Sequence, residues 1–148
     1  MAVETISTAV LDFLRTCLST RFQIPKNQFY FELRDDSKER SVALYSLGKV
    51  QDKYTYANQW QYRRDYQIQV VCGKSISEAH EAAEWLYEHV VVANTGLIEH
   101  NGYRFFMLPD GAAIPRYLGT LPNGCHKYAV DVLIIYFPVD NNNDNNNE

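Results

Sequence analysis

The stretch YLGTLPNGCHKYAVDVLIIYF (residues 117–137) contains a Pro-Asn-Gly turn followed by a long apolar segment. From His126 to Asp131 polar and apolar side chains alternate, which is typical of a strand with one covered face. From Val132 to Phe137 no polar residue occurs, which indicates a strand covered on both faces. The sequence therefore predicts a central strand here, and we expect part of its cover to come from another subunit.

Composition indicates one globular domain of ordinary size. The chain has 148 residues, 46% hydrophobic and 22% charged, with a formal net charge of -4. This charge does not favour nucleic acid as the main partner, because phosphate binding requires a basic face. No apolar run approaches the roughly 20 residues of a membrane-spanning helix, and no signal peptide is expected at the N-terminus. Three widely spaced cysteines predict reduced, buried thiols.

Hydrophobic periodicity predicts two amphipathic helices, over residues 4–20 and 76–92. Ser75 and Glu78 have the spacing of a capping box at the start of the second helix, and Gly96 follows its end. The alanines in this helix favour close packing against a sheet.

Alternating side chains predict strands at 29–33, 42–48 and 60–72, and a hairpin at 97–108 around an Asn-Gly turn. The polar segment 49–59 is expected to be a loop or an extended hairpin arm. Within the third strand an aromatic row is interrupted by Arg64, which suggests a twist, a bulge or a charge at an interface.

The predicted order is helix-strand-strand-strand-helix-hairpin-strand. This order indicates the α+β class, with a mixed, mainly antiparallel sheet and two helices packed on one face. The other face, expected to be rich in Tyr, Trp and Phe, remains uncovered. We expect a single α+β domain at 1–139. The Asn-rich residues 140–148 are expected to be disordered unless a partner orders them.

The search for catalytic or metal-binding motifs favours a protein that is not an enzyme. The segment HEAAE (80–84) resembles a zinc-protease motif that lacks its second histidine. A solvated pair of His80 and Glu84 on one helix face explains it better. Phosphate-binding loops and nucleophile elbows do not occur in the sequence. We therefore predict no catalytic residues, no cofactor and no metal.

Four stretches resemble the tail terminator proteins of long-tailed bacteriophages, also described as tail-to-head joining or minor capsid proteins. They are VALYSLG (42–48), YRRDYQIQVVCGKSISEAHEAAEWLYEHV (62–90), NGYRFF (101–106) and residues 117–137. The last stretch resembles the closing hairpin of that family. Leu121-Pro122 stands where the family usually has an acidic pair before Asn-Gly.

The resemblance implies a structural virion protein that forms a hexameric ring. Such a ring caps the tail tube, ends its polymerisation and joins the tail to the head connector. The implied partners are other copies of the chain, the tail tube protein and the head-completion or stopper protein. The implied location is the virion neck or upper tail, with host cytoplasm during assembly. Membrane and sequence-specific nucleic acid are not expected partners.

A ring needs contacts between two different patches of neighbouring subunits. Aromatic residues and arginine dominate the energetics of interfaces. We expect the interface residues to be Tyr54, Tyr56, Trp60, Tyr62, Arg63 and Arg64.

Trp60 and Tyr62 could each instead complete the core of their own domain. Two alternatives for the whole protein stay open at this point. The first is another phage neck component, such as a stopper or head-completion protein. The second is a small cytosolic α+β enzyme or ligand-binding domain.

Overall fold

The computed structural model describes residues 5–32, 36–56, 59–93, 96–110 and 114–137, with the backbone alone at 48–56 and 59–60. Two helices cover the sheet, α1 (Ile6–Leu18) and α2 (Ile76–Trp85). The second helix continues as a π-helical segment, η2 (Leu86–Val92), and a short 3₁₀ turn, η1 (Lys26–Gln28), precedes the first strand. The strands are β1 (Phe29–Phe31), β2 (Arg40–Tyr56), β3 (Gln59–Cys72), β4 (Ile98–His100), β5 (Tyr103–Pro109), β6 (Arg116–Thr120) and β7 (His126–Phe137).

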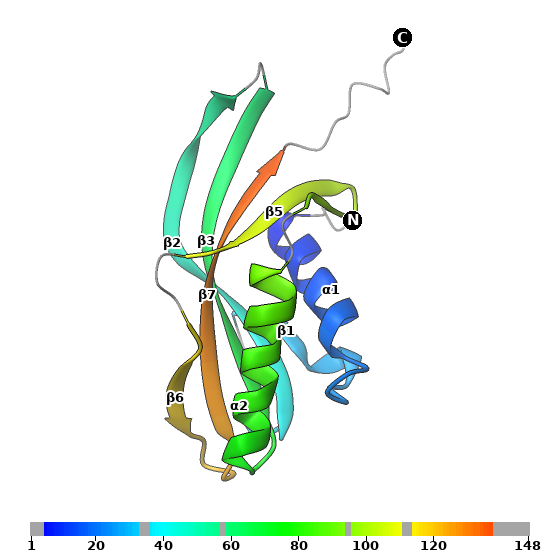
Figure 1. Ribbon diagram of the computed structural model, residues 1–148, viewed down its shortest axis with the longest axis vertical. Coiled ribbons are helices and arrows are strands. Elements are labelled where there is room, and N and C mark those ends of the chain that lie inside the picture. The colour runs from blue at the N-terminus through cyan, green and yellow to red at the C-terminus, as the bar shows by residue number, and fades with distance from the viewer. Residues whose placement is uncertain (1–4, 33–35, 57–58, 94–95, 111–113, 138–148) are drawn as a thin grey trace.

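The described strands form one mixed sheet in the order β1-β2-β3-β7-β5-β4. The β1–β2 pair is parallel, and the other pairs are antiparallel. The β6–β7 hairpin places β6 beside the first half of β7, while β5 pairs with its second half. Both helices lie against the sheet (Figure 1). The predicted α+β class and the central position of residues 126–137 are therefore confirmed.

The core lies between the helices and the even-numbered side chains of β3 and β7. Leu14 of α1, Leu86 of η2 and Ile68 of β3 have no exposed surface, and they belong to one continuous cluster. Tyr66 is also fully buried, and its hydroxyl shares a 2.6 Å hydrogen bond with Ser7 Oγ of α1. Both helices pack on the same side of the sheet (Figure 1), so one face of the sheet is covered by helices and the other is not.

The β2–β3 hairpin forms a long arm. Its two strands have 17 and 14 residues, and the arm extends past the helices (Figure 1). The segment 49–59, expected to be a loop or a hairpin arm, is such an arm over its described residues. The pairing of β2 with β3 shifts between Ser46 and Val50, and Val50 is the partner of Arg64. The irregularity expected near Arg64 is therefore present as extra residues in β2.

The aromatic row of β3 lies on the face that the helices cover. The prediction that the uncovered face would be the one rich in Tyr, Trp and Phe is therefore wrong for this strand. The register between β3 and β7 is continuous from Tyr62 to Val71, and so Tyr62 and Tyr66 share a face with the buried Ile68. The opposite face of β3 carries Arg63 and a row of polar side chains instead, namely Asp65, Gln67 and Gln69. We call this face, which neither helix covers, the uncovered face.

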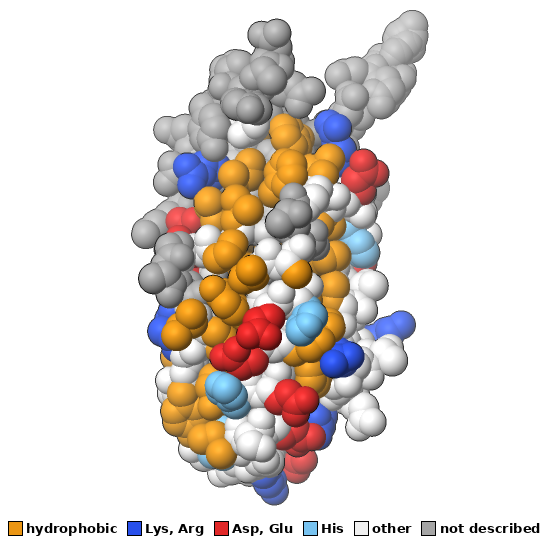
Figure 2. Space-filling model, in the orientation of Figure 1, with side chains coloured by type: hydrophobic (Ala, Val, Ile, Leu, Met, Phe, Trp, Pro, Cys, Tyr) orange, Lys and Arg blue, Asp and Glu red, His pale blue; other side chains and the backbone are white. Residues whose placement is uncertain are grey.

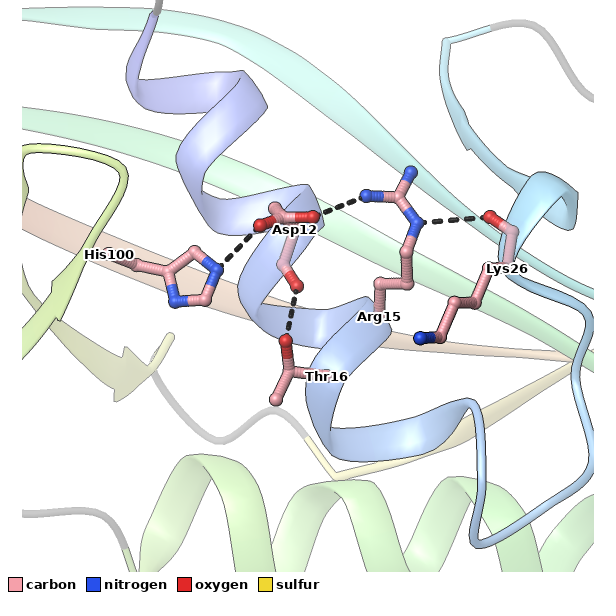
Figure 3. A network of polar contacts seen from close by, with 5 residues as sticks. All are labelled: Asp12, Arg15, Thr16, Lys26 and His100. Carbon is pink, nitrogen blue, oxygen red and sulfur yellow. Dashed lines mark hydrogen bonds and ion pairs between the residues drawn. The ribbon is translucent and has the colours of Figure 1, made fainter.

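A polar network fixes α1 against the β4–β5 hairpin (Figure 3). Asp12 Oδ2 lies 2.6 Å from His100 Nε2, and Asp12 Oδ1 accepts a 2.6 Å hydrogen bond from Arg15. Arg15 Nε donates to the carbonyl of Lys26, which ties the same helix to η1. Burial opposes the charge on Asp12, but its hydrogen bonds to His100 and Arg15 outweigh burial and lower its pKa.

The predicted start of the second helix is confirmed. Ser75 Oγ accepts from the backbone N–H of Glu78 at 3.3 Å, as in a capping box. The Glu78 carboxylate does not return to the cap, because it pairs with Arg40 at 3.1 Å. Within the described residues, no helix combines the length and apolar character needed to cross a bilayer. The Asn-rich segment 140–148 lies outside the described residues.

Candidate assembly surface

Three of the six predicted interface residues lie on the arm. Tyr54 and Tyr56 are in the outer part of β2, and Trp60 is near the start of β3. Their side chains lie outside the described part of the structure. The backbone shows that the two strands pair up to Tyr56 and Gln59, so all three residues belong to the part of the hairpin beyond the sheet partner β7.

Tyr62 lies at the base of the arm, in an aromatic cluster on the covered side. Its ring stacks on Tyr136 of β7 with centroids 5.2 Å apart, and Tyr103 of β5 meets Tyr136 edge-on at 6.2 Å. Burial raises the pKa of Tyr136, and the charge of Arg64 partly offsets this effect. Tyr62 therefore joins the arm to the domain and is partly covered by its own chain.

Arg63 and Arg64 point to opposite sides of β3. Arg64 helps to line a hollow of about 510 Å³ beside the start of α1 and the end of β1. Arg63 lies on the uncovered face, where its register partner on β7 is Ile135. The structure therefore does not bring the two arginines together as one charged patch.

An apolar strip on the uncovered face was not singled out from the sequence. Its members pair across β5 and β7 on the same side of the sheet and are all half-buried: Phe106, Leu108, Leu133, Ile135 and Phe137. Arg63 and Arg104 flank the strip, and the Arg104 guanidinium lies 5.4 Å from the centre of the Phe137 ring. The unbroken apolar run of residues 132–137 could have indicated this strip, since its odd-numbered members are three of the five strip residues.

The lower part of the uncovered face is polar and internally hydrogen-bonded. Asp131 accepts from Gln67 at 3.1 Å and pairs with Arg116 of β6 at 2.9 Å. Gln69 donates to Gln67 at 2.7 Å, which extends the chain of contacts across β3. Asp131 and Gln67 are therefore hydrogen-bonded, while Gln69 Oε1 is buried without a partner. The apolar strip beside these residues gains most from being covered.

Exposed hydrophobic side chains continue beyond the strip. Figure 2 shows hydrophobic side chains gathered in a band over β5 and β7 that continues toward β6. Near β6, Ile114 is 61% exposed, Tyr117 45% and Leu118 41%. Large apolar surface of this kind is typical of a protein that contacts other chains.

Two further groups of polar side chains have structural partners. A second hollow, of about 430 Å³, lies between the end of α1 and the start of α2, where Arg40 binds Glu78, the carbonyl of Phe22 and Cys72 Sγ. His80 and Glu84 form the expected i,i+4 pair, at 3.5 Å. The described residues contain no group of three side chains suited to hold a metal ion.

The cysteines behave as predicted from their apolar surroundings. Cys72 and Cys125 are buried, Cys17 is half-buried, and all three are free thiols. Burial raises the pKa of Cys17 and of Cys72 to about 11, with Arg40 partly opposing the effect at Cys72. A thiol in this state carries little thiolate at neutral pH.

The fold is of the α+β class, and it is shared with a component of a virus-like particle. The chain is similar to a chain in a solved structure described as "Virion of native gene transfer agent (GTA) particle", with a TM-score of 0.51 and 14% sequence identity. The match covers 89% of this chain and 94% of that chain. No family model and no curated protein sequence matches the chain.

Proposed function

We propose that the protein is a structural component of a phage-like virion, and that it forms the ring that ends the tail tube and joins the tail to the head. The observation that carries this proposal is the shared fold with a chain of a gene transfer agent virion, which extends over nearly the whole of both chains. The sequence resemblance to phage tail terminators supports the same role.

The surfaces of the molecule suit a ring. A closed ring requires that one patch of each subunit contact a different patch of the next. The arm of β2 and β3 is one such patch, and the apolar strip of the uncovered face is a second. Because the two differ in shape and position, their contact is heterologous and repeats around a ring.

In this proposal each ring contains six copies of the protein. The tail tube protein binds one side of the ring, and a head-completion or stopper protein binds the other. The proposal assigns no catalytic step and no cofactor. In this role Tyr54, Tyr56 and Trp60 act as aromatic anchors on the arm, with Arg63 beside the apolar strip.

The test is the mass of the purified protein, alone and with tail tubes, measured by mass photometry. We expect a discrete oligomer near six subunits, or hexamers that appear only on tubes. Trp60→Ala should leave a folded monomer and abolish the ring, because interface anchors of this type contribute on the order of 2 kcal/mol or more.

Ile76→Ala is the matched control, since Ile76 is an exposed apolar residue at the start of α2, on the side of the helices and at the other end of the molecule from the arm (Figure 1). This variant should form rings normally. A wild-type protein that stays monomeric and does not associate with tubes would contradict the proposed function. A Trp60→Ala protein that unfolds would assign Trp60 to the core.

A further inference from the structure

One edge of β2 is covered only near its start. Strand β3 pairs with β2 as far as Tyr56, but on the opposite edge the described strands supply β1 alone, from Val42 to Leu44. Further along β2, towards the arm, this edge has no described strand beside it. Bare strand edges invite pairing with other chains, and proteins usually protect them with a specific device.

Glu32 provides such a device directly after β1. Its backbone N–H donates a 3.0 Å hydrogen bond to the carbonyl of Leu44, as the next residue of a parallel strand would. In a regular parallel pair the carbonyl of Glu32 would then accept from the N–H of Ser46, two residues further along β2. The side chain accepts this bond instead, since Ser46 N–H donates to Glu32 Oε2 at 3.1 Å. The carboxylate thus takes the place of the main-chain carbonyl of its own residue.

The backbone conformation of Glu32 explains this exchange of acceptors. Its φ is +68°, in the left-handed region that is unfavourable for residues other than glycine. A residue in this conformation does not continue a strand, and β1 ends at Phe31. A strained residue persists where surrounding contacts hold it, and here the bonds to Leu44 and Ser46 do so.

The capped N–H lies at the base of the arm. Ser46 is the last residue of β2 before its pairing with β3 shifts, and its partner on β3 is Tyr66. Pairing resumes between Val50 and Arg64. Burial raises the pKa of Tyr66, and the nearby charge of Glu32 acts in the same direction. The carboxylate therefore lies close to the point at which the arm leaves the rest of the sheet.

We propose that Glu32 is a positioning residue of the arm: its carboxylate caps the edge of β2 at Ser46 and fixes the direction in which the arm leaves the domain. Because it occupies the N–H that follows the β1 pairing, it also keeps a further strand from extending along this edge. The cap is a property of the single chain, and only its consequence for assembly rests on the proposed function.

Amide hydrogen exchange of the full-length protein, at a concentration where it is monomeric, tests the cap. Glu32→Gly removes the carboxylate and suits the left-handed backbone, so this variant should fold. We expect the Ser46 amide to exchange about five- to tenfold faster in Glu32→Gly than in the wild type. The amide bonded to β3 just beyond the register shift, at Val50 or Gln51, should also exchange faster. Glu32→Gln keeps an oxygen acceptor on a side chain of the same length and should show a smaller change.

Gln23→Gly is the matched control. Gln23 also has a left-handed backbone, with φ +56°, but it lies between α1 and β1 and not beside β2. Its replacement should relieve similar strain and leave exchange at Ser46 unchanged. Unchanged exchange at Ser46 in Glu32→Gly would overturn the cap. Equally fast exchange in both glycine variants would overturn it too, because the effect would then be a general loosening of the chain.

Mass photometry separates this proposal from the proposed function. If the wild type forms rings, Glu32→Gly should raise the protein concentration at which half of the chains are in rings about three- to tenfold, since a less fixed arm must be ordered on contact. Gln23→Gly should leave that concentration unchanged. The same concentration for Glu32→Gly and the wild type would overturn the positioning role. If the wild type forms no rings, alone or on tubes, the proposed function fails, and the exchange rates at Ser46 and in the arm still decide the cap.

Discussion

Arg63 and Arg64 show how one step along a strand separates two roles. Arg63 borders the apolar strip of the uncovered face, and Arg64 lines the hollow next to α1. A contact made by one arginine is therefore out of reach of the other. Substitutions at the two positions should affect different surfaces of the protein: the uncovered face for Arg63, and the hollow beside α1 for Arg64.

Asp12 contributes to stability through its bonds to His100 and Arg15, and this contribution depends on pH. Because the folded-state pKa of Asp12 is lowered, its contribution is present above the ordinary carboxyl pKa and is lost as the pH falls through the folded-state value. Asp12 is about one-third exposed, so we expect Asp12→Asn to destabilise the protein by about 1 kcal/mol at pH 7 in urea unfolding.

The difference between Asp12→Asn and the wild type should shrink when unfolding is repeated at acidic pH. Glu99→Gln, which removes an exposed carboxylate from β4, serves as the control and should change stability by less than about 0.5 kcal/mol. A difference for Asp12→Asn that is independent of pH would show that its charge is not involved.

The side chains of β3 also mark the limit of what sequence can predict at this scale. Alternation showed correctly that Tyr62, Tyr66 and Ile68 share a face. It did not show which face the helices would cover, because that choice depends on long-range packing. The hydroxyl of Tyr66 shares a hydrogen bond with Ser7, which lies 59 residues away in the sequence. A local sequence pattern cannot predict a contact of this kind.

Among the elements, the helices and hairpins were predicted within a few residues, and residues 49–59 were predicted as either a loop or an extended hairpin arm. The helices have apolar stripes and a cap, and the turns contain Asn-Gly or Pro-Asn-Gly, so local chemistry determines them. The sequence of β2 shows no regular apolar alternation beyond Leu47, so the local pattern did not decide between a loop and a strand. Strand β6 was not predicted either. It pairs only with β7 among the described strands and is largely exposed.

Gly73 joins β3 to α2, and a substitution at this position tests whether the junction requires a glycine backbone conformation. Its φ is +89°, and a Cβ added there would lie 2.7 Å from Glu78 Oε1. Gly73→Ala should therefore strain the backbone and disturb the Arg40–Glu78 pair, lowering the free energy of unfolding by about 1–3 kcal/mol.

Gly96→Ala is the matched control for this junction, since its φ is not positive and nothing lies within 4 Å of an added Cβ. It should be neutral or stabilise the protein by up to about 1 kcal/mol. Thermal unfolding followed by circular dichroism measures both variants, and equal effects would contradict the role assigned to Gly73.

For the whole molecule, the domain and its assembly should be separable by shortening the arm. Tyr54 pairs with Gln61, so an Asn-Gly turn can replace residues 55–60 without changing the register of the remaining hairpin and without removing Tyr62. We expect a protein with a native circular dichroism spectrum that forms no rings in mass photometry, because Tyr56 and Trp60 are gone. Rings formed by this variant would place the subunit contact elsewhere.

Deleting residues 140–148 is the control for that experiment. These residues follow β7 in sequence, and six of the nine are asparagine. The fold and the assembly should both survive their removal. If the deletion abolished rings, the Asn-rich segment would be part of the contact.

The arm has a mechanical consequence, because β3 runs from it into the middle of the sheet as one strand. Its hydrogen bonds to β2 and β7 lie side by side across the strand. A pull along the arm therefore loads many of these bonds in shear at once, instead of opening them singly from an end. In the proposed ring, a neighbouring subunit that binds the arm is thereby attached to a strand with hydrogen-bonded partners on both sides, which suits a contact under tension.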